Sequence, residues 1–468
     1  MSIFKKSLRN IIFPLILFVS SACGSEDEES SSDDFVPEGP NFVLGALEES
    51  KESLKSSCGS DVRTLPMPID HNNPAETFDY RYQYMTAQTS AQTTVVHLPG
   101  GPGQGYMGAD RDSYPAQFNH ILIDPRTLGC NYQSSSVIAN DFVSTRQHAA
   151  DIVAIVKTLG LDNYVLYGIS YGTVVATVAA DLIRQDATIN VPRAIVFEGI
   201  VGEPSRGTAY NDAFKQQWDL RLEFIPGLQA VFSNAGSLPF GYSSDQWTSI
   251  LNSLLSIGGE IADSFLYAAV DPRPYDVTVL KAILDGFLQG GASPLGTRRF
   301  YQQVGCRELF DDNRYFNYLS SGDFKVFDAN DYLAEGVTLE AALGGCSVID
   351  MNDPYDPISY TMADVPTYYF QGRGDPNTPI AEAKIHFNAK SELSAKYFIE
   401  IAHAGHNPFS IQLDDCSDKV WEHVLAGTNP FGDIITSRGC VSSILLRNKA
   451  FYERVKPLQV FGHPSSWH

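Results

Sequence analysis

The segment Gly168-Ile169-Ser170-Tyr171-Gly172 places a serine between two glycines, directly after the apolar run Tyr164–Tyr167 and directly before a stretch of helical periodicity. A serine on such a sharp strand-to-helix turn can present its hydroxyl as a nucleophile. The flanking glycines are needed because a Cβ on either side would collide with neighbouring backbone. Ser170 is therefore the candidate nucleophile, and an ordinary glycine-rich turn with a capping serine is the alternative.

A serine nucleophile needs a base, and the base needs an acid that fixes its tautomer. In the fold that carries its serine on such a strand-to-helix turn, these groups follow along the chain in the order serine, acid, histidine. Asp375 lies in a turn after one predicted strand, and His406 follows a glycine after the next. We therefore predict a catalytic triad of Ser170, Asp375 and His406. His403 is the alternative base, although its position closer to the strand is also typical of a packed histidine.

A serine that attacks a carbonyl also needs N–H donors for the oxyanion that develops. The loop Pro99–Gly105 reads P-G-G-P-G-Q-G and follows a predicted strand. Its glycines allow the backbone to approach a reacting carbonyl closely. We expect the backbone N–H groups of Gly101 and Tyr171 to form the oxyanion hole, with an ordinary Gly/Pro turn as the alternative.

Short apolar strands alternate with helical stretches along most of the chain. Several strands are continuous apolar runs, which is typical of strands covered on both faces. The sequence therefore predicts an α/β fold with a mainly parallel sheet and helices on both faces. The predicted strands are Thr77–Met85, Thr93–Leu98, His120–Ile123, Asn163–Tyr167, Arg193–Phe197, Thr367–Gln371 and Lys396–Ile401, and the first predicted helices are Thr145–Leu159 and Thr173–Arg184.

The strand signal stops between about residues 204 and 345, and helical periodicity replaces it. A segment of this length is too long for a loop, so we predict a helical cap inserted into the core. The predicted division is a signal peptide at 1–22, a tether at 23–55, a first core part at 56–203, the cap at 204–349 and a second core part at 350–468. The cap helices are expected at Asp212–Phe224, Asp245–Ile257, Val277–Leu288 and Arg298–Phe310.

The N-terminus has the features of an export signal. Lys5, Lys6 and Arg9 precede the apolar stretch Ile11–Val19, which is too short to span a bilayer. Small residues then lead into Cys23, and this pattern resembles the bacterial lipoprotein signal, in which the cysteine receives lipid. The usual leucine three residues before the cysteine is here a serine, and ordinary signal cleavage with Cys23 as an incidental thiol is the alternative. We expect an exported chain anchored by lipid at the bacterial outer membrane, or at the cell surface of a host without one.

Residues 24–40 are rich in acids and contain no base, so they read as a solvated tether that cannot form a core. The whole chain has 33 Lys+Arg against 55 Asp+Glu and a formal net charge of −22. Nucleic acid is a polyanion and repels such a chain, and no Lys/Arg-rich run offers a local exception. We therefore exclude nucleic acid as a partner.

The chain has seven cysteines, and six remain when Cys23 is set aside. In an exported protein an even set predicts disulfides. We expect pairing by proximity along the chain. No C-x-x-C pair is present, and His403-x-x-His406 has no nearby third ligand, so we expect neither a zinc site nor another cofactor. The expected pairs are Cys58–Cys130, Cys306–Cys346 and Cys416–Cys440.

Taken together, these motifs resemble the α/β-hydrolase serine peptidases that include proline iminopeptidase and the secreted tripeptidyl aminopeptidases. The oxyanion loop, the serine turn, Asp375-Pro376-Asn377-Thr378-Pro379 and Gly405-His406 all match in order, and Asp124–Gly129 echoes a further motif with Thr127 in place of a glycine. The resemblance spans about residues 58–440 and includes a helical cap. The cysteine positions are also similar to those of the tripeptidyl branch.

This resemblance implies release of amino-terminal residues or short peptides from peptides through an acyl-enzyme on Ser170. Such an enzyme must hold a free α-amine, which needs carboxylates in or near the cap. Glu198, Glu203 and Glu308 are the candidates, and Glu308 beside Cys306 resembles the tripeptidyl pattern most. A carboxylesterase or lipase with the same triad is the alternative, because a triad specifies acyl transfer and not the acyl donor. A surface-binding lipoprotein with an inactive hydrolase fold is a third possibility, and the intact triad argues against it.

Overall fold

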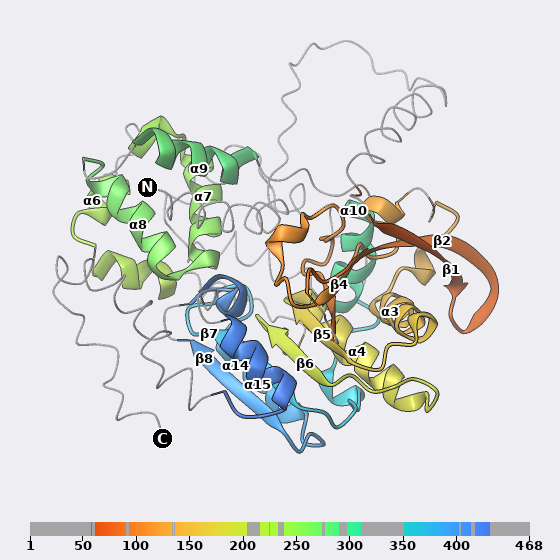
Figure 1. Cartoon of the computed structure of the whole chain (residues 1–468). Coiled ribbons are helices and arrows are strands. Elements are labelled where there is room, and N and C mark those ends of the chain that lie inside the picture. The colour runs from red at the N-terminus through yellow and green to blue at the C-terminus, as the bar shows by residue number, and fades with distance from the viewer. Residues whose placement is uncertain are drawn as a thin grey trace, which may run out of the picture.

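A computed structural model of the chain shows one central sheet with helices packed around it (Figure 1). The structure describes residues 58, 61–89, 93–132, 134, 136–203, 216–223, 225–232, 238–273, 277–289, 297–309, 351–401, 404–412 and 417–430.

The sheet has eight strands in the order β1-β2-β4-β3-β5-β6-β7-β8. β1 pairs antiparallel with β2, and β2 pairs antiparallel with β4, whereas all other neighbours are parallel. The carboxyl ends of the parallel strands therefore meet at one edge. The strands are β1 Val62–Asp70, β2 Asn73–Met85, β3 Thr94–Leu98, β4 Asn119–Ile123, β5 Tyr164–Ile169, β6 Ala194–Glu198, β7 Thr367–Gly372 and β8 Lys396–Ile401.

Each face of the sheet is covered by apolar side chains, because successive residues of a strand point to opposite faces. In β5, Tyr164 and Leu166 pack into the core on one face, whereas Val165 and Tyr167 pack into the core on the other. Helices α3, α4 and α14 contribute to the first core, and α15 contributes to the second. The predicted α/β sheet with helices on both faces is thus confirmed. These helices are α3 Thr145–Leu159, α4 Tyr171–Gln185, α14 Ile380–Ala389 and α15 Ser417–Ala426.

Helix α3 shows how local sequence sets these elements. Ser144 is its N-cap and accepts the N–H of Gln147 on its side chain, which satisfies one of the free donors of the first turn. Gly160 ends the helix in a left-handed conformation with φ +58°. A residue with a Cβ is disfavoured there, and a C-terminal glycine is the usual solution. The helix has the bounds that its apolar periodicity predicts.

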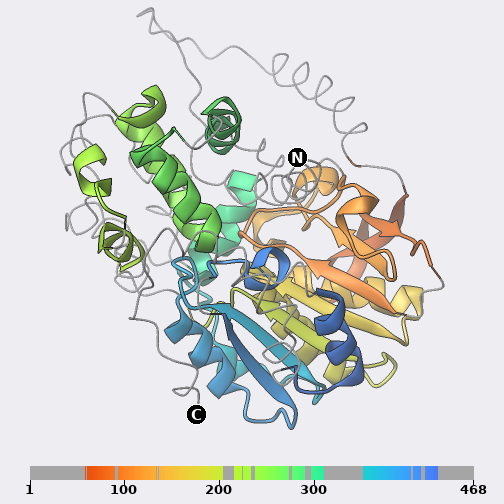
Figure 2. The same cartoon turned by 60° about the vertical axis from the view of Figure 1, so that its left-hand side comes forward.

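The described residues between β6 and β7 are largely helical, and most of them pack among themselves. Helices α6 to α9 gather at one side of the molecule, away from β1 and β2 (Figures 1 and 2). They share a hydrophobic core of their own that includes Trp218, Trp247, Leu251 and Leu266. We call this group the cap. Its helices are α6 Leu228–Phe232, α7 Ser244–Ile257, α8 Gly259–Val270 and α9 Val277–Gln289.

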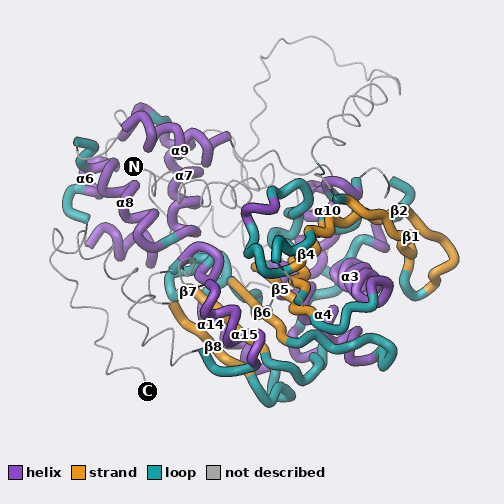
Figure 3. The backbone as a smooth tube through the Cα atoms, in the orientation of Figure 1, coloured by secondary structure: helices purple, strands orange, loops and turns teal. Residues whose placement is uncertain are grey.

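A short helix, α10 (Thr297–Phe300), continues into a π-helical segment, η5 (Tyr301–Leu309). Phe300, Val304 and Leu309 pack in the core beneath the sheet rather than in the core of the cap. The tube in Figure 3 shows this helical stretch lying against the sheet, apart from α6 to α9. The chain thus returns from the cap to the core before β7.

Cys58 and Cys130 form a disulfide with a Cα–Cα distance of 5.8 Å, which is the first of the predicted pairs. Cys306 is also disulfide-bonded. Cys23, Cys346, Cys416 and Cys440 lie outside the described residues, as do the predicted signal peptide and acidic tether. Within the described part of the chain, no helix is long and apolar enough to cross a membrane.

Candidate active site

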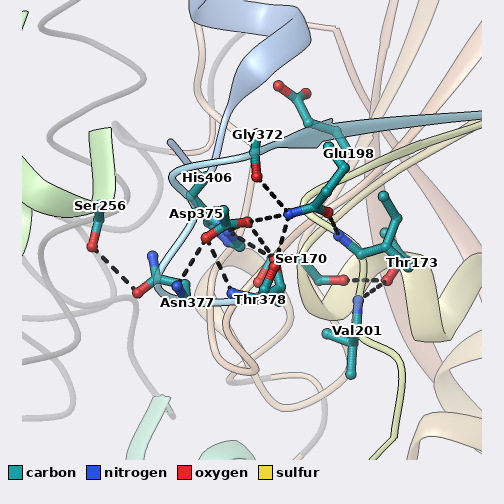
Figure 4. Close-up of polar contacts among 12 residues, drawn as sticks. Ser170, Thr173, Glu198, Val201, Ser256, Gly372, Asp375, Asn377, Thr378 and His406 are labelled. Atoms are coloured by element: carbon teal, nitrogen blue, oxygen red, sulfur yellow. Dashed lines mark hydrogen bonds and ion pairs between the residues drawn. The ribbon is translucent and has the colours of Figure 1, made fainter. Parts of the chain in front are cut away.

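The predicted catalytic residues all lie at the edge where the parallel strands end. Ser170 follows β5, Asp375 comes three residues after β7, and His406 comes five residues after β8. The glycine-rich loop Pro99–Gly105 follows β3. Open α/β sheets place their sites at this edge, so the topology brings together residues far apart in the sequence. Figure 4 shows Ser170, Asp375 and His406 in one close-up of this region.

Ser170 occupies a strained turn between β5 and α4. Its φ of +54° and ψ of −122° are unusual for a residue with a Cβ. A Cβ on Gly168 would lie 2.3 Å from the carbonyl oxygen of Gly172, and one on Gly172 would lie 2.1 Å from that of Leu98. Both glycines are therefore required by close backbone contacts. This geometry is that of a nucleophile elbow, in which the serine side chain projects from the end of the strand.

Asp375 is a buried carboxylate held by several donors. Its Oδ1 accepts the N–H groups of Asn377 at 2.8 Å and Thr378 at 3.1 Å. Its Oδ2 accepts Gln371 Nε2 at 3.0 Å and Thr378 Oγ1 at 2.5 Å, besides bonding His406 Nδ1 at 2.9 Å. Its side chain has almost no freedom to rotate away from the histidine.

His406 is 3% exposed and packs directly against the strand next to the nucleophile. A Cβ on Gly199, the residue after β6, would lie 2.8 Å from Cε1 and Nδ1 of the imidazole. Because Asp375 accepts a hydrogen bond from Nδ1, the proton is on Nδ1 and the lone pair of Nε2 is left for the serine hydroxyl. The alternative base, His403, lies outside the described residues.

Two backbone segments that contain the predicted oxyanion donors adjoin Ser170. Tyr171 is the first residue of α4, so its N–H is one of the helix donors without a partner inside the helix. A Cβ on Gly100 would lie 3.2 Å from Cβ of Ser170, which places the glycine-rich loop against the nucleophile. Gly101 has φ +109°, a conformation that favours glycine. The structure thus places Tyr171 directly after Ser170, and Gly100, the neighbour of Gly101, against it.

Asp124, at the end of β4, fastens the glycine-rich loop. Its carboxylate accepts the N–H of Met107 at 3.0 Å and that of Cys130 at 2.9 Å. A Cβ on Gly105 or Gly129 would lie 2.1 Å or 2.2 Å from its oxygens, so both backbones close around it. Burial raises the pKa of Asp124 to about 6, against the opposing effect of the N–H donors. The family motif contains this aspartate, but the sequence does not show that it ties down the oxyanion loop.

Glu308, one of the candidate amine ligands, is linked to the residue after the nucleophile through Thr145. Its Oε1 accepts the N–H of Thr145 at 3.0 Å, and Thr145 Oγ1 is hydrogen-bonded to the hydroxyl of Tyr171 at 3.0 Å. Tyr171 in turn follows Ser170. Burial raises the pKa of Glu308 to about 8, so the carboxyl is largely protonated at neutral pH.

Glu198, a second candidate, is fully buried at the end of β6. Its Oε1 accepts the N–H groups of Phe409 at 2.8 Å and Ser410 at 2.9 Å and the hydroxyl of Ser410 at 3.0 Å. The hydroxyl of Tyr167 donates to its other oxygen. Glu198 thus holds the segment that follows His406. Glu203, the third candidate, is half-buried at the start of the segment that leads into the cap.

Sequence analysis missed the supporting residues of the acid. Thr378 contributes both its N–H and its hydroxyl to Asp375, and Gln371 contributes its side-chain amide. The signal for Thr378 was present, because an aspartate followed by backbone donors two and three residues on is an Asx turn. Among the described residues, no cluster of His, Cys, Asp or Glu could hold a metal ion.

Known proteins that are similar to the chain share little sequence with it. No curated protein matches the chain. Similar solved structures include a putative non-heme bromoperoxidase, BpoC, from Mycobacterium tuberculosis, which is 15% identical with a TM-score of 0.43 over 77% of this chain and 99% of that one. An esterase from a Rhodococcus species is 14% identical with a TM-score of 0.40 over 78% and 98%. An esterase from Exiguobacterium antarcticum is 11% identical with a TM-score of 0.39 over 75% and 97%.

The family comparison covers more than half of the chain. A family model described as the alpha/beta hydrolase fold matches residues 93–411, a range that runs from the first parallel strand to the segment after His406. The match includes the serine turn, the acid turn and the histidine loop in the order that this fold uses. The eight-stranded sheet and the positions of these turns agree with it. The chain therefore belongs to the alpha/beta hydrolase family.

Proposed function

We propose that the protein is an exported serine hydrolase that releases amino-terminal residues or short peptides from peptides through an acyl-enzyme on Ser170. The observation that carries the proposal is the buried Asp375–His406 hydrogen bond of 2.9 Å beside the strained Ser170 turn. Such an arrangement can perform acyl transfer without a cofactor. The expected partners are a peptide with a free N-terminus and a membrane, the latter only through lipid on Cys23.

In the first step, His406 Nε2 takes the proton of the Ser170 hydroxyl while Oγ attacks the scissile carbonyl carbon. The carbonyl oxygen becomes an oxyanion, which accepts hydrogen bonds from the N–H groups of Gly101 and Tyr171. The imidazolium is stabilised by Asp375 and then gives its proton to the leaving amine as the C–N bond breaks. Water, activated by the same histidine, hydrolyses the acyl-enzyme and releases Ser170.

The amino-terminal specificity rests on Glu308. A substrate ammonium must be recognised by an acceptor of negative charge close to the nucleophile. One oxygen of Glu308 accepts a single N–H, that of Thr145, whereas Oε1 of Glu198 accepts three donors from Phe409 and Ser410 and its other oxygen accepts the hydroxyl of Tyr167. We therefore assign the α-amine to Glu308 rather than to Glu198. An acidic protein surface would also attract cationic peptide termini.

The test is a panel of chromogenic aminoacyl-, prolyl- and tripeptidyl-amides with free N-termini, compared with the same compounds acetylated at the N-terminus and with short-chain esters. We expect turnover of the free-amine amides and loss of turnover on acetylation. Ser170→Ala is the control for contaminating activity. Cleavage of esters alone at every pH tested would overturn the peptidase proposal and leave a carboxylesterase. Failure of the wild-type protein to react with any substrate or with a fluorophosphonate would leave an inactive surface-binding protein.

A further inference from the structure

A corner of the cap lies directly on the loop that carries the catalytic base. Helix α7 ends at Ile257 and α8 begins at Gly259, and the chain turns between them at Gly258, which has φ +63° and ψ −165°. We call Ser256–Gly258 the cap corner. We call Ala404–His406 the base loop.

The cap corner and the base loop are joined through their backbones. The N–H of His406 donates to the carbonyl of Ser256 at 2.7 Å, and the N–H of Gly405 donates to the carbonyl of Ile257 at 3.1 Å. The last residue of the corner also forms an antiparallel bridge with the first residue of the loop. The backbone of the catalytic histidine is therefore anchored to a cap helix as well as to the core.

The contact is too close for side chains at its two glycines. A Cβ on Gly405 would lie 2.1 Å from the carbonyl oxygen of Ser256 and 2.4 Å from that of Ile257. A Cβ on Gly258 would lie 2.8 Å from the nitrogen of Gly405, and the positive φ of Gly258 disfavours any other residue. The two backbone segments thus approach each other to a distance that only glycine allows at these positions.

The same corner also reaches the acid. The hydroxyl of Ser256 donates to Oδ1 of Asn377 at 3.2 Å, and the N–H of Asn377 donates to Oδ1 of Asp375 at 2.8 Å. Figure 4 shows Ser256 and Asn377 on the cap side of Asp375 and His406. One cap residue is therefore linked to both the acid turn and the base loop.

We propose that the cap corner is a positioning element of the triad, so that the placement of the cap sets the alignment of His406 and Asp375 as well as the access of substrate. This inference rests on the triad mechanism proposed above and is independent of whether the acyl donor is a peptide or an ester. Moving the corner would shift the imidazole relative to Ser170. Displacement of a catalytic group by about 1 Å can lower the rate by about 100-fold.

The test compares two variants of the cap in which a glycine at positive φ becomes alanine. Gly258→Ala disturbs the corner, whereas Gly241→Ala, at φ +77° with no atom within 4 Å of the new Cβ, does not touch the base loop. The readout is the second-order rate constant for labelling by a small fluorophosphonate, which needs an activated Ser170. We expect Gly258→Ala to label about 10- to 100-fold more slowly and Gly241→Ala to stay within about twofold of the wild type.

A milder variant, Ser256→Ala, tests the same inference if Gly258→Ala does not fold. Ser256→Ala removes the hydroxyl that donates to Asn377 and keeps the backbone of the cap corner, and we expect it to lower kcat about threefold at unchanged KM, with recovery in Ser256→Thr. Equal labelling rates in folded Gly258→Ala and in the wild type, or unchanged kcat in Ser256→Ala, would overturn the inference. Absence of labelling in the wild type would instead overturn the proposed triad, since Ser170→Ala would then behave identically.

Discussion

At the scale of single residues, the conformation of Ser170 favours reactivity at the expense of stability. A residue with a Cβ at φ +54° costs about 1–3 kcal/mol relative to a relaxed one. Glycine carries no such penalty at positive φ. The strain is therefore a property of this position that mutation can reveal.

We predict that Ser170→Gly is more stable than Ser170→Ala by about 1 kcal/mol, because glycine relieves the strain and alanine keeps it. Both variants lack the nucleophile and should be equally inactive. Urea denaturation followed by circular dichroism measures the difference in the free energy of unfolding. Equal stability of the two variants would show that the turn is not strained.

Glu308 gives a prediction on pH. Its pKa is about 8 in the folded protein against an ordinary value of 4.5, because burial disfavours the charged form. A raised pKa means that the folded state binds the proton more tightly than the unfolded state does. The contribution of Glu308 to stability is therefore complete below about pH 4.5 and is lost as the pH rises through 8. The wild-type protein should lose about 5 kcal/mol of stability over this range from Glu308 alone, and Glu308→Gln should lose correspondingly less. Unfolding free energies measured from pH 4 to pH 9 for both proteins provide the check.

The same residue predicts a kinetic signature. If Glu308 binds the substrate ammonium, the ionised carboxylate is required, so KM for free-amine substrates should fall as the pH rises toward 8 and increase again once the amine loses its proton. Glu308→Gln should raise KM for free-amine substrates and leave KM for esters unchanged. An equal rise for both substrate classes would assign Glu308 a purely structural role at Thr145.

At the scale of elements, the loop after β3 depends on a carboxylate from the end of β4. We predict that Asp124→Ala lowers stability by about 2–3 kcal/mol, because the N–H groups of Met107 and Cys130 are left buried without an acceptor. It should also lower kcat more than KM, because the oxyanion loop loses its anchor. Thermal unfolding and steady-state kinetics measure the two effects. Asp271→Ala, at an exposed ion pair in the cap, is the control and should change stability by less than about 0.5 kcal/mol.

The sequence predicts the central strands to within a few residues, because buried strands are continuous apolar runs. It does not reveal β1, since this edge strand has one fully buried residue, Met67, and contains Pro66 and Pro68. It also does not reveal α8, because the pair Gly258-Gly259 reads as a break, whereas in the structure the pair marks the corner where α8 begins. Both elements depend on tertiary contacts that local propensity does not encode.

The candidate site likewise contains residues that the sequence predicts and residues that it does not. The three triad residues are predictable because each one follows a strand in a recognisable motif. The roles of Glu198 and Ser256 are not, since their partners lie 211 and 121 residues away in the sequence. An acid at the end of a strand can equally bind a substrate or satisfy buried N–H groups, and only its neighbours in space decide between the two.

At the scale of the whole molecule, the Cys58–Cys130 disulfide ties the start of the described chain to the segment after β4. It closes a loop of 72 residues that contains β1 to β4. We predict that the double variant Cys58→Ala/Cys130→Ala loses about 2–4 kcal/mol of stability, because the unfolded chain regains the freedom that the crosslink removes. Chemical denaturation under non-reducing conditions measures the loss. A variant as stable as the wild type would contradict this account.

The join between the cap corner and the base loop is made of main-chain donors and acceptors, which every residue type supplies alike. Substitution elsewhere in the cap therefore leaves these bonds available, as long as the two glycines at the contact are kept. The cap also has a hydrophobic core separate from that of the sheet. Homologous enzymes that differ in cap sequence, and so in the substrates they accept, would keep the same backbone hydrogen bonds that position the histidine. For protein engineering, the corner is a requirement that any replacement of the cap has to keep.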